Sequence, residues 1–151
     1  MDKSKRPGTI PPNKYNEHAW IIGEPEIGDD VWIGAFTLID GSGGLKIGTG
    51  CNISSGAHIY THSTIRRCLS ERKYSKVDRK PVEIGEHVFI GANATVLMGS
   101  KIGHHSIIGA GSVVLENSVI PPYSVAVGVP AKVTKSGKRE VEKIIKGNEK
   151  I

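Results

Sequence analysis

The sequence predicts an all-β fold, a parallel β-helix of hexapeptide repeats, and a six-residue period is the main observation behind this prediction. From residue 84 to residue 120, an aliphatic residue recurs at every sixth position, and a small or β-branched residue follows four positions after each one. This period fits neither the roughly 3.6 residues of an α-helical turn nor a single alternating strand. It fits short strands joined at glycine-containing corners, as in parallel β-helices. The aliphatic positions are Ile84, Ile90, Val96, Ile102, Ile108, Val114 and Ile120.

The stacking of these repeats follows from the period. If three hexapeptides make one coil, residue i lies under residue i+18, and Ile84, Ile102 and Ile120 form one internal column. Each column buries apolar surface, which stabilises the fold by about 25 cal/mol per Å². The residue before each inward aliphatic should point outward. Trp32 and Phe89 occupy such positions, so we expect them at a subunit interface.

The 151 residues predict one domain with a sizeable core, flanked by an arm and a tail. Residues 1–19 form an irregular N-terminal arm, and residues 20–135 form the β-helix. Within it the repeat slips by two residues at Gly41–Gly44, resumes, and runs to Ile65. A loop at about residues 66–80 then protrudes and reaches over a neighbouring surface. Residues 136–151 form a basic C-terminal helix or tail that caps the last coil.

Composition and charge narrow the functional classes. The net charge of +5 is concentrated on the arm, the loop and the tail, which favours a small polyanionic ligand over nucleic acid as partner. The sequence contains no signal-peptide pattern and no long apolar run, so we expect a cytoplasmic protein without membrane insertion. Cys51 falls at a small-residue repeat position, and the two cysteines are expected to be reduced.

Four segments carry a resemblance to a known family: IYTHST, the irregular loop after it, KPVEIGEHVFIGANATV and VGVPAKV. In this order, across about residues 20–135, they resemble the left-handed β-helix acyltransferases, and within them the maltose/galactoside O-acetyltransferase and sugar acetyltransferase branch. The resemblance implies a left-handed coil and a homotrimer with shared active sites. It also implies transfer of an acetyl group from acetyl-CoA to a hydroxyl or amine of a sugar, nucleotide-sugar or related small acceptor.

The resemblance assigns His62 as the general base and Asp40 to the substrate site. The stacking supports their proximity, because Ile39 and Ile59 lie 20 positions apart, one coil of 18 plus the slip of two. Asp40 could therefore accept a hydrogen bond from a sugar hydroxyl or orient the imidazole. An Asx turn at the bulged corner explains Asp40 equally well.

For the coenzyme, the resemblance points to small residues in the second repeat block and basic residues after GVP. Ala92 and Ala110 would let the pantetheine approach the backbone, although both alanines are also explained as ordinary residues of the repeat with no binding role. Lys132 and Lys135 would bind the phosphates as point charges.

Two alternatives remain open at this level, a non-catalytic hexapeptide-repeat scaffold and a zinc-dependent carbonic anhydrase of the γ type. In the carbonic anhydrase signature, histidines stand where this chain has Ala92 and Leu97, so no metal is expected. The remaining histidines of the repeats are interpreted as solvated or interface residues; they are His58, His87, His104 and His105.

Overall fold

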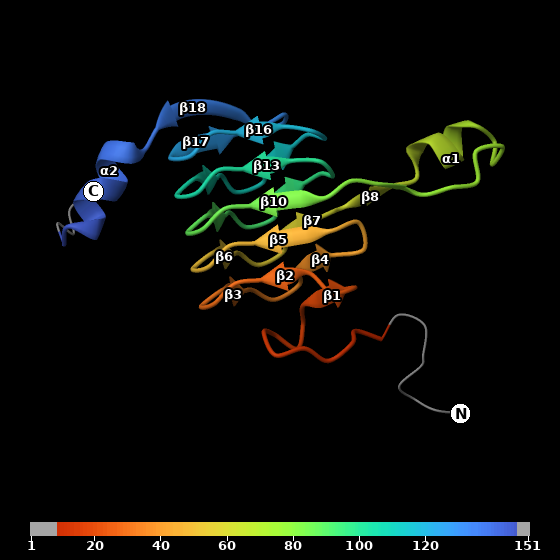
Figure 1. The fold of residues 1–151 in the computed structure, drawn as a ribbon, viewed down its shortest axis with the longest axis horizontal. Helices are drawn as coiled ribbons and strands as arrows, with labels where there is room; N and C mark the ends of the chain where they lie inside the picture. Colours follow the sequence, from red (N-terminus) through yellow and green to blue (C-terminus); the bar gives the residue numbers. More distant parts are fainter. Residues whose placement is uncertain (1–8, 148–151) are drawn as a thin grey trace.

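The computed structural model describes residues 9–147, which form the predicted left-handed parallel β-helix (Figure 1). Successive short strands visit three parallel sheets in turn, and each sheet is one wall of the coil. Sheet A contains β1 (Trp20–Ile22), β4 (Leu38–Asp40), β7 (His58–Ile59), β12 (Thr95–Val96) and β15 (Val113–Val114). Sheet B contains β2 (Glu26–Ile27), β5 (Leu45–Ile47), β10 (Val82–Ile84), β13 (Lys101–Ile102) and β16 (Val119–Ile120). Sheet C contains β3 (Trp32–Ile33), β6 (Asn52–Ile53), β11 (Phe89–Ile90), β14 (Ile107–Ile108), β17 (Ser124–Val127) and β18 (Lys132–Ser136).

The register confirms the predicted internal columns. Ile84 pairs with Ile102 and Ile102 with Ile120, so residues 18 apart stack in sheet B. Ile90 pairs with Ile108 in the same way in sheet C, and both are fully buried. Cys51 is also buried, as its repeat position predicted. Each inward side chain therefore packs on the coils above and below it, which explains why the sequence needs an aliphatic residue at each repeat.

The outward positions differ between the walls. On sheet C, Trp32, Phe89 and Ile107 are partly exposed, by 63%, 44% and 41%, which confirms that Trp32 and Phe89 point outward. On sheet B the corresponding outward column is charged and alternates in sign. Its charged members are Glu26, Lys46, Glu83 and Lys101, and the exposed Val119 ends the column. The outside of sheet C is therefore mostly apolar, although it includes Asn52, and the outside of sheet B is mostly charged.

The loop that interrupts the repeat leaves between β7 of sheet A and β10 of sheet B, and it projects from the coil in Figure 1. It is more ordered than an irregular arm. β8 (His62–Ser63) and β9 (Asp78–Arg79) pair as an antiparallel ribbon at its root, and α1 (Ile65–Leu69) lies beyond them. Ile65 is 58% exposed in α1, so its interpretation as an inward repeat position is wrong. The repeat ends at Ile59 because the ribbon then carries the chain outward.

The C-terminal segment contains the predicted short helix, α2 (Lys138–Ile145), but the helix does not cap the last coil. β18 covers part of that edge by pairing antiparallel with β17. α2 extends beside the coil in Figure 1, and its Val141, Ile144 and Ile145 face Phe89 and Ile107 of sheet C across a cavity of about 470 Å³. The apolar side of α2 thus faces the outside of sheet C and not the open edge of the last coil. No helix within residues 9–147 is long and apolar enough to cross a membrane.

Candidate active site

The two-residue slip after β4 positions the candidate site. Gly43 lies directly below Thr61, where its backbone N–H donates a hydrogen bond to the Thr61 hydroxyl oxygen at 2.8 Å. A Cβ atom at Gly43 would stand 2.2 Å from the Thr61 carbonyl oxygen, so only glycine fits. This close approach lets the corner bulge inward and places Asp40 under Thr61 and His62.

Asp40 is fully buried, and its carboxylate is saturated with donors. Oδ1 accepts the backbone N–H of Ser42 at 2.9 Å, which forms the Asx turn that the sequence left open. Oδ2 accepts the backbone N–H of Thr61 at 2.9 Å and lies 3.0 Å from the Thr61 hydroxyl. Oδ2 also lies 2.5 Å from Nδ1 of His62. The predicted proximity of Asp40 and His62 is therefore present in the structure.

These contacts fix the charge of Asp40. Burial by itself would raise the pKa of the carboxyl, but the hydrogen bonds from His62, Ser42 and Thr61 outweigh burial and leave the pKa well below its ordinary range. An ionised carboxylate only accepts hydrogen bonds, so Nδ1 of His62 carries the proton. Nε2 has no hydrogen-bond partner among residues 9–147, so it is a free acceptor in the neutral form of the ring.

His62 is accessible, with a side chain that is 34% exposed, and aromatic rings lie beside it. The ring of Tyr60 stands edge-on to His62 at a centroid distance of 6.0 Å and edge-on to His58 at 5.9 Å. The Tyr60 hydroxyl lies 3.3 Å from Nδ1 of His58. The base candidate is therefore held from below by a buried carboxylate, while its outer edge can meet a bound molecule.

Two family descriptions match the two halves of the repeat. The description "Bacterial transferase hexapeptide (six repeats)" matches residues 81–116, and "Hexapeptide repeat of succinyl-transferase" matches residues 26–61. Both halves of the coil therefore match hexapeptide repeats described in transferases. No curated protein sequence matches it.

Solved structures of acyltransferases share the fold of this chain. A variant of AntD, an N-acyltransferase from Bacillus cereus in complex with dTDP and coenzyme A, has 25% identity and a TM-score of 0.74 over 87% of this chain and 74% of its own. A hexapeptide-repeat acetyltransferase from Vibrio cholerae, complexed with acetyl-CoA, has 31% identity and a TM-score of 0.64 over 74% and 60%. A maltose O-acetyltransferase from Clostridium difficile has 26% identity and a TM-score of 0.62 over 77% and 65%.

The residues predicted to bind the coenzyme lie apart from His62. Ala92 and Ala110 are exposed and stack at the corner that leads from sheet C into sheet A, where Gly111 N–H donates to the Ala92 carbonyl at 2.8 Å. Lys132 pairs with Val127 near the top of the same corner. His62 leaves sheet A at the opposite corner, which leads toward sheet B.

Lys135 lies further along β18, opposite Val125, and is also exposed. The structure thus groups Ala92, Ala110 and Lys132 along one edge, and Lys135 lies further from this edge along β18. One chain by itself does not bring this group to His62.

A second group of histidines lies at the corner between sheets B and C. The rings of His87 and His105 stand 5.1 Å apart, and the ring of Tyr123 stacks on His105 at 5.2 Å. Burial lowers the pKa of His105, and the neighbouring His87 and His104 lower it further. Within the part of the chain that the structure describes, no three His, Cys, Asp or Glu side chains are grouped to hold a metal ion.

Sequence reasoning missed two residues of the site, Thr61 and Arg79. The glycine at position 43 was the available signal for Thr61, because a close backbone approach needs a partner. Arg79 pairs with His62 across the β8–β9 ribbon. No periodic signal identifies Arg79, because the loop leaves the repeat before the ribbon returns.

Proposed function

We propose that this protein transfers the acetyl group of acetyl-CoA to a hydroxyl or amino group of a sugar, nucleotide-sugar or related small acceptor, with His62 as the general base. The observation that carries the proposal is the buried Asp40–His62 pair, which leaves Nε2 of an accessible imidazole free. The acetyl-CoA complex of the Vibrio cholerae protein and the maltose O-acetyltransferase named above support the reaction class. Mutual orientation of a carboxylate and an imidazole is the usual way to prepare such a base.

The reaction needs no covalent enzyme intermediate. Nε2 of His62 takes the proton from the acceptor as its oxygen or nitrogen attacks the thioester carbonyl. The tetrahedral intermediate collapses with loss of the coenzyme thiolate, and the imidazolium returns the proton to sulfur. Backbone N–H groups steady the oxyanion. The products are the acetylated acceptor and coenzyme A.

Asp40 is assigned to this mechanism as a positioning residue. Because its side chain is fully buried and its oxygens already accept four hydrogen-bond contacts, burial favours orientation of the imidazole over direct contact with the acceptor. The ionised carboxylate also stabilises the imidazolium that forms during proton transfer.

A homotrimer with shared active sites completes the proposal. Within one chain, the edge with Ala92, Ala110 and Lys132 and the edge with His62 lie on opposite sides of sheet A. Coenzyme held along the first edge would reach the base on the second edge of a neighbouring subunit. The apolar outward column on sheet C, with Trp32 and Phe89, supports association, while the charged column on sheet B stays in water.

Turnover of acetyl-CoA against a panel of sugars, amino sugars and nucleotide-sugars tests the function. We expect one acceptor class to release coenzyme A and gain one acetyl group by mass spectrometry, with no change when a chelator is added. Failure of the protein to bind coenzyme A and to acetylate any member would favour the scaffold alternative. Loss of activity with chelator would favour a metal-dependent reaction.

A further inference from the structure

The β8–β9 ribbon places an arginine beside the proposed base. His62 pairs with Arg79, and the Lys80 N–H donates to the Thr61 carbonyl at 3.1 Å on one side of that pair. This flanking bond marks His62 and Arg79 as a non-hydrogen-bonded pair, in which the Cα atoms are about 4.5 Å apart and the side chains share one face. Arg79 is exposed, and no carboxylate within residues 9–147 forms an ion pair with it.

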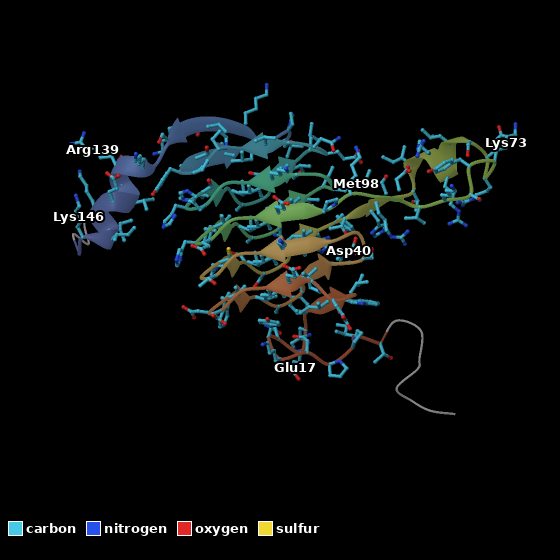
Figure 2. The ribbon with its side chains drawn as sticks, viewed as in Figure 1. Glu17, Asp40, Lys73, Met98, Arg139 and Lys146 are labelled. Atoms are coloured by element: carbon cyan, nitrogen blue, oxygen red, sulfur yellow. The ribbon has the colours of Figure 1, made fainter. Side chains whose placement is uncertain are left out.

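Arg79 also lines a cavity of about 420 Å³ between the root of the loop and the coils above it. Figure 2 shows Met98, which lines this cavity, near the root of the loop, and Lys73 at the loop's far end. The full lining is Ser63, Ile65, Arg66, Asp78, Arg79, Lys80, Met98 and Glu116. The cavity and the base therefore share Arg79 as a common neighbour.

The charges of the lining do not cancel. Asp78 is neutralised, because it forms an ion pair with Arg66 and accepts a hydrogen bond from the Tyr74 hydroxyl at 2.8 Å. The Arg66 contact is the larger cause that lowers the pKa of Asp78, to about 2. The Lys80 ammonium donates to the neutral Asn117 side chain, at 3.2 Å.

The cations without an acidic partner in this lining are therefore Arg79 and Lys80, and the opposing charge comes from Glu116. This arrangement leaves a net positive site. A planar guanidinium binds phosphate oxygens in a bidentate manner, and an ammonium adds a point charge.

We infer that this cavity binds a phosphate group of the acceptor, so that the substrate is a phosphorylated sugar or a nucleotide-sugar and not a neutral sugar. The inference rests on the proposed function, because the acceptor is what His62 deprotonates. An acceptor whose phosphate is held by Arg79, which shares a ribbon face with His62, presents the rest of its body to the imidazole. Lys80 adds positive charge from the lining of the cavity. The coenzyme also carries phosphates, but the lysines assigned to it lie on β18 at the last coil.

Binding of inorganic pyrophosphate, measured by titration calorimetry on the full-length protein saturated with coenzyme A, tests this site. The parent should bind pyrophosphate, and Arg79→Gln should weaken binding by roughly tenfold or more, the value of a charge-assisted hydrogen bond. Glu116→Gln should tighten binding, because it removes the opposing charge. Lys73→Gln removes the same charge as Arg79→Gln from the far end of the loop and should change binding by less than about twofold.

Three results would overturn the inference: no pyrophosphate binding to the parent, parental binding by Arg79→Gln, or binding only when coenzyme A is absent. The last result would assign the phosphate site to the coenzyme. If Arg79→Gln does not fold by circular dichroism, Lys80→Gln provides the same test. Because no turnover is measured, His62→Ala should still bind pyrophosphate, and a failure of the phosphate site is distinguishable from a failure of the proposed reaction.

Discussion

Replacement of Asp40 by asparagine tests the orientation of the base most sharply. The change preserves shape but can place an amide NH₂ group against Nδ1 of His62, where Oδ2 now lies at 2.5 Å. Nδ1 would then have to accept, and the proton would move to Nε2, which could no longer act as a base. We expect turnover to fall by about 10²–10⁴-fold, the contribution of a positioned base, as Asp→Asn changes do in Ser-His-Asp enzymes.

The assay is steady-state turnover at saturating acetyl-CoA and acceptor, with Asp29→Asn as a matched control. Asp29 is an exposed carboxylate at another corner, so its variant should retain parental turnover. The Michaelis constant for acetyl-CoA should stay within about twofold in both variants, because Asp40 is buried and lies apart from the residues proposed to bind the coenzyme. Parental turnover by Asp40→Asn would refute the orienting role.

Stability provides a second measurement on the same variant. The pKa of Asp40 is lowered in the folded protein, so the ionised carboxylate stabilises the fold above its ordinary pKa of about 3.9. That stabilisation is lost as the pH falls from about 5 through the folded-state pKa. The difference in unfolding free energy between parent and Asp40→Asn should therefore shrink on acidification. A difference that stays constant between pH 6 and pH 2 would contradict the assignment.

Three further predictions concern the core, the coenzyme and the assembly. Ile90→Ala should cost about 2–5 kcal/mol of unfolding free energy in urea, because Ile90 is fully buried between Ile53 and Ile108, while exposed Lys101→Ala should change it by less than about 0.5 kcal/mol. Lys132→Ala and Lys135→Ala should each raise the Michaelis constant for acetyl-CoA with little change in turnover, and the increase should be larger at low salt. Lys46→Ala on the charged wall should leave the Michaelis constant unchanged. Equal Michaelis constants in all variants would exclude the assignment of Lys132 and Lys135 to the phosphates. Light scattering after size exclusion should give a trimer for the parent and smaller species for Trp32→Arg, and a monomeric parent would remove the shared site.

The sequence was sufficient to predict the coil because its period is a direct consequence of stacking. Ile84, Ile102 and Ile120 recur at the spacing that one coil requires, and the register reproduces it. The same arithmetic, with the slip included, predicted that Asp40 lies close to His62. Because every coil repeats the same packing, the stacking of the coils can be predicted from a single sequence.

The parts that sequence did not predict depend on contacts outside the period. The burial of Asp40 depends on how closely Gly43 approaches Thr61, a distance that no pattern specifies. The helix α2 was expected on the last coil because its apolar stripe needs a partner, but amphipathicity does not say which surface provides one. Arg79 pairs with His62 only because the loop returns as an antiparallel strand, which the broken repeat concealed.

The turnover of His62→Ala on an identified acceptor tests directly whether His62 is the general base of acetyl transfer. Turnover should fall by about 10²–10⁴-fold while the dissociation constant for coenzyme A stays at the parental value, because the residues proposed to bind the coenzyme lie at the other corner of sheet A. Parental turnover by His62→Ala would contradict the role of His62, and His58, whose Nδ1 lies 3.3 Å from the Tyr60 hydroxyl, would become the next candidate for the base.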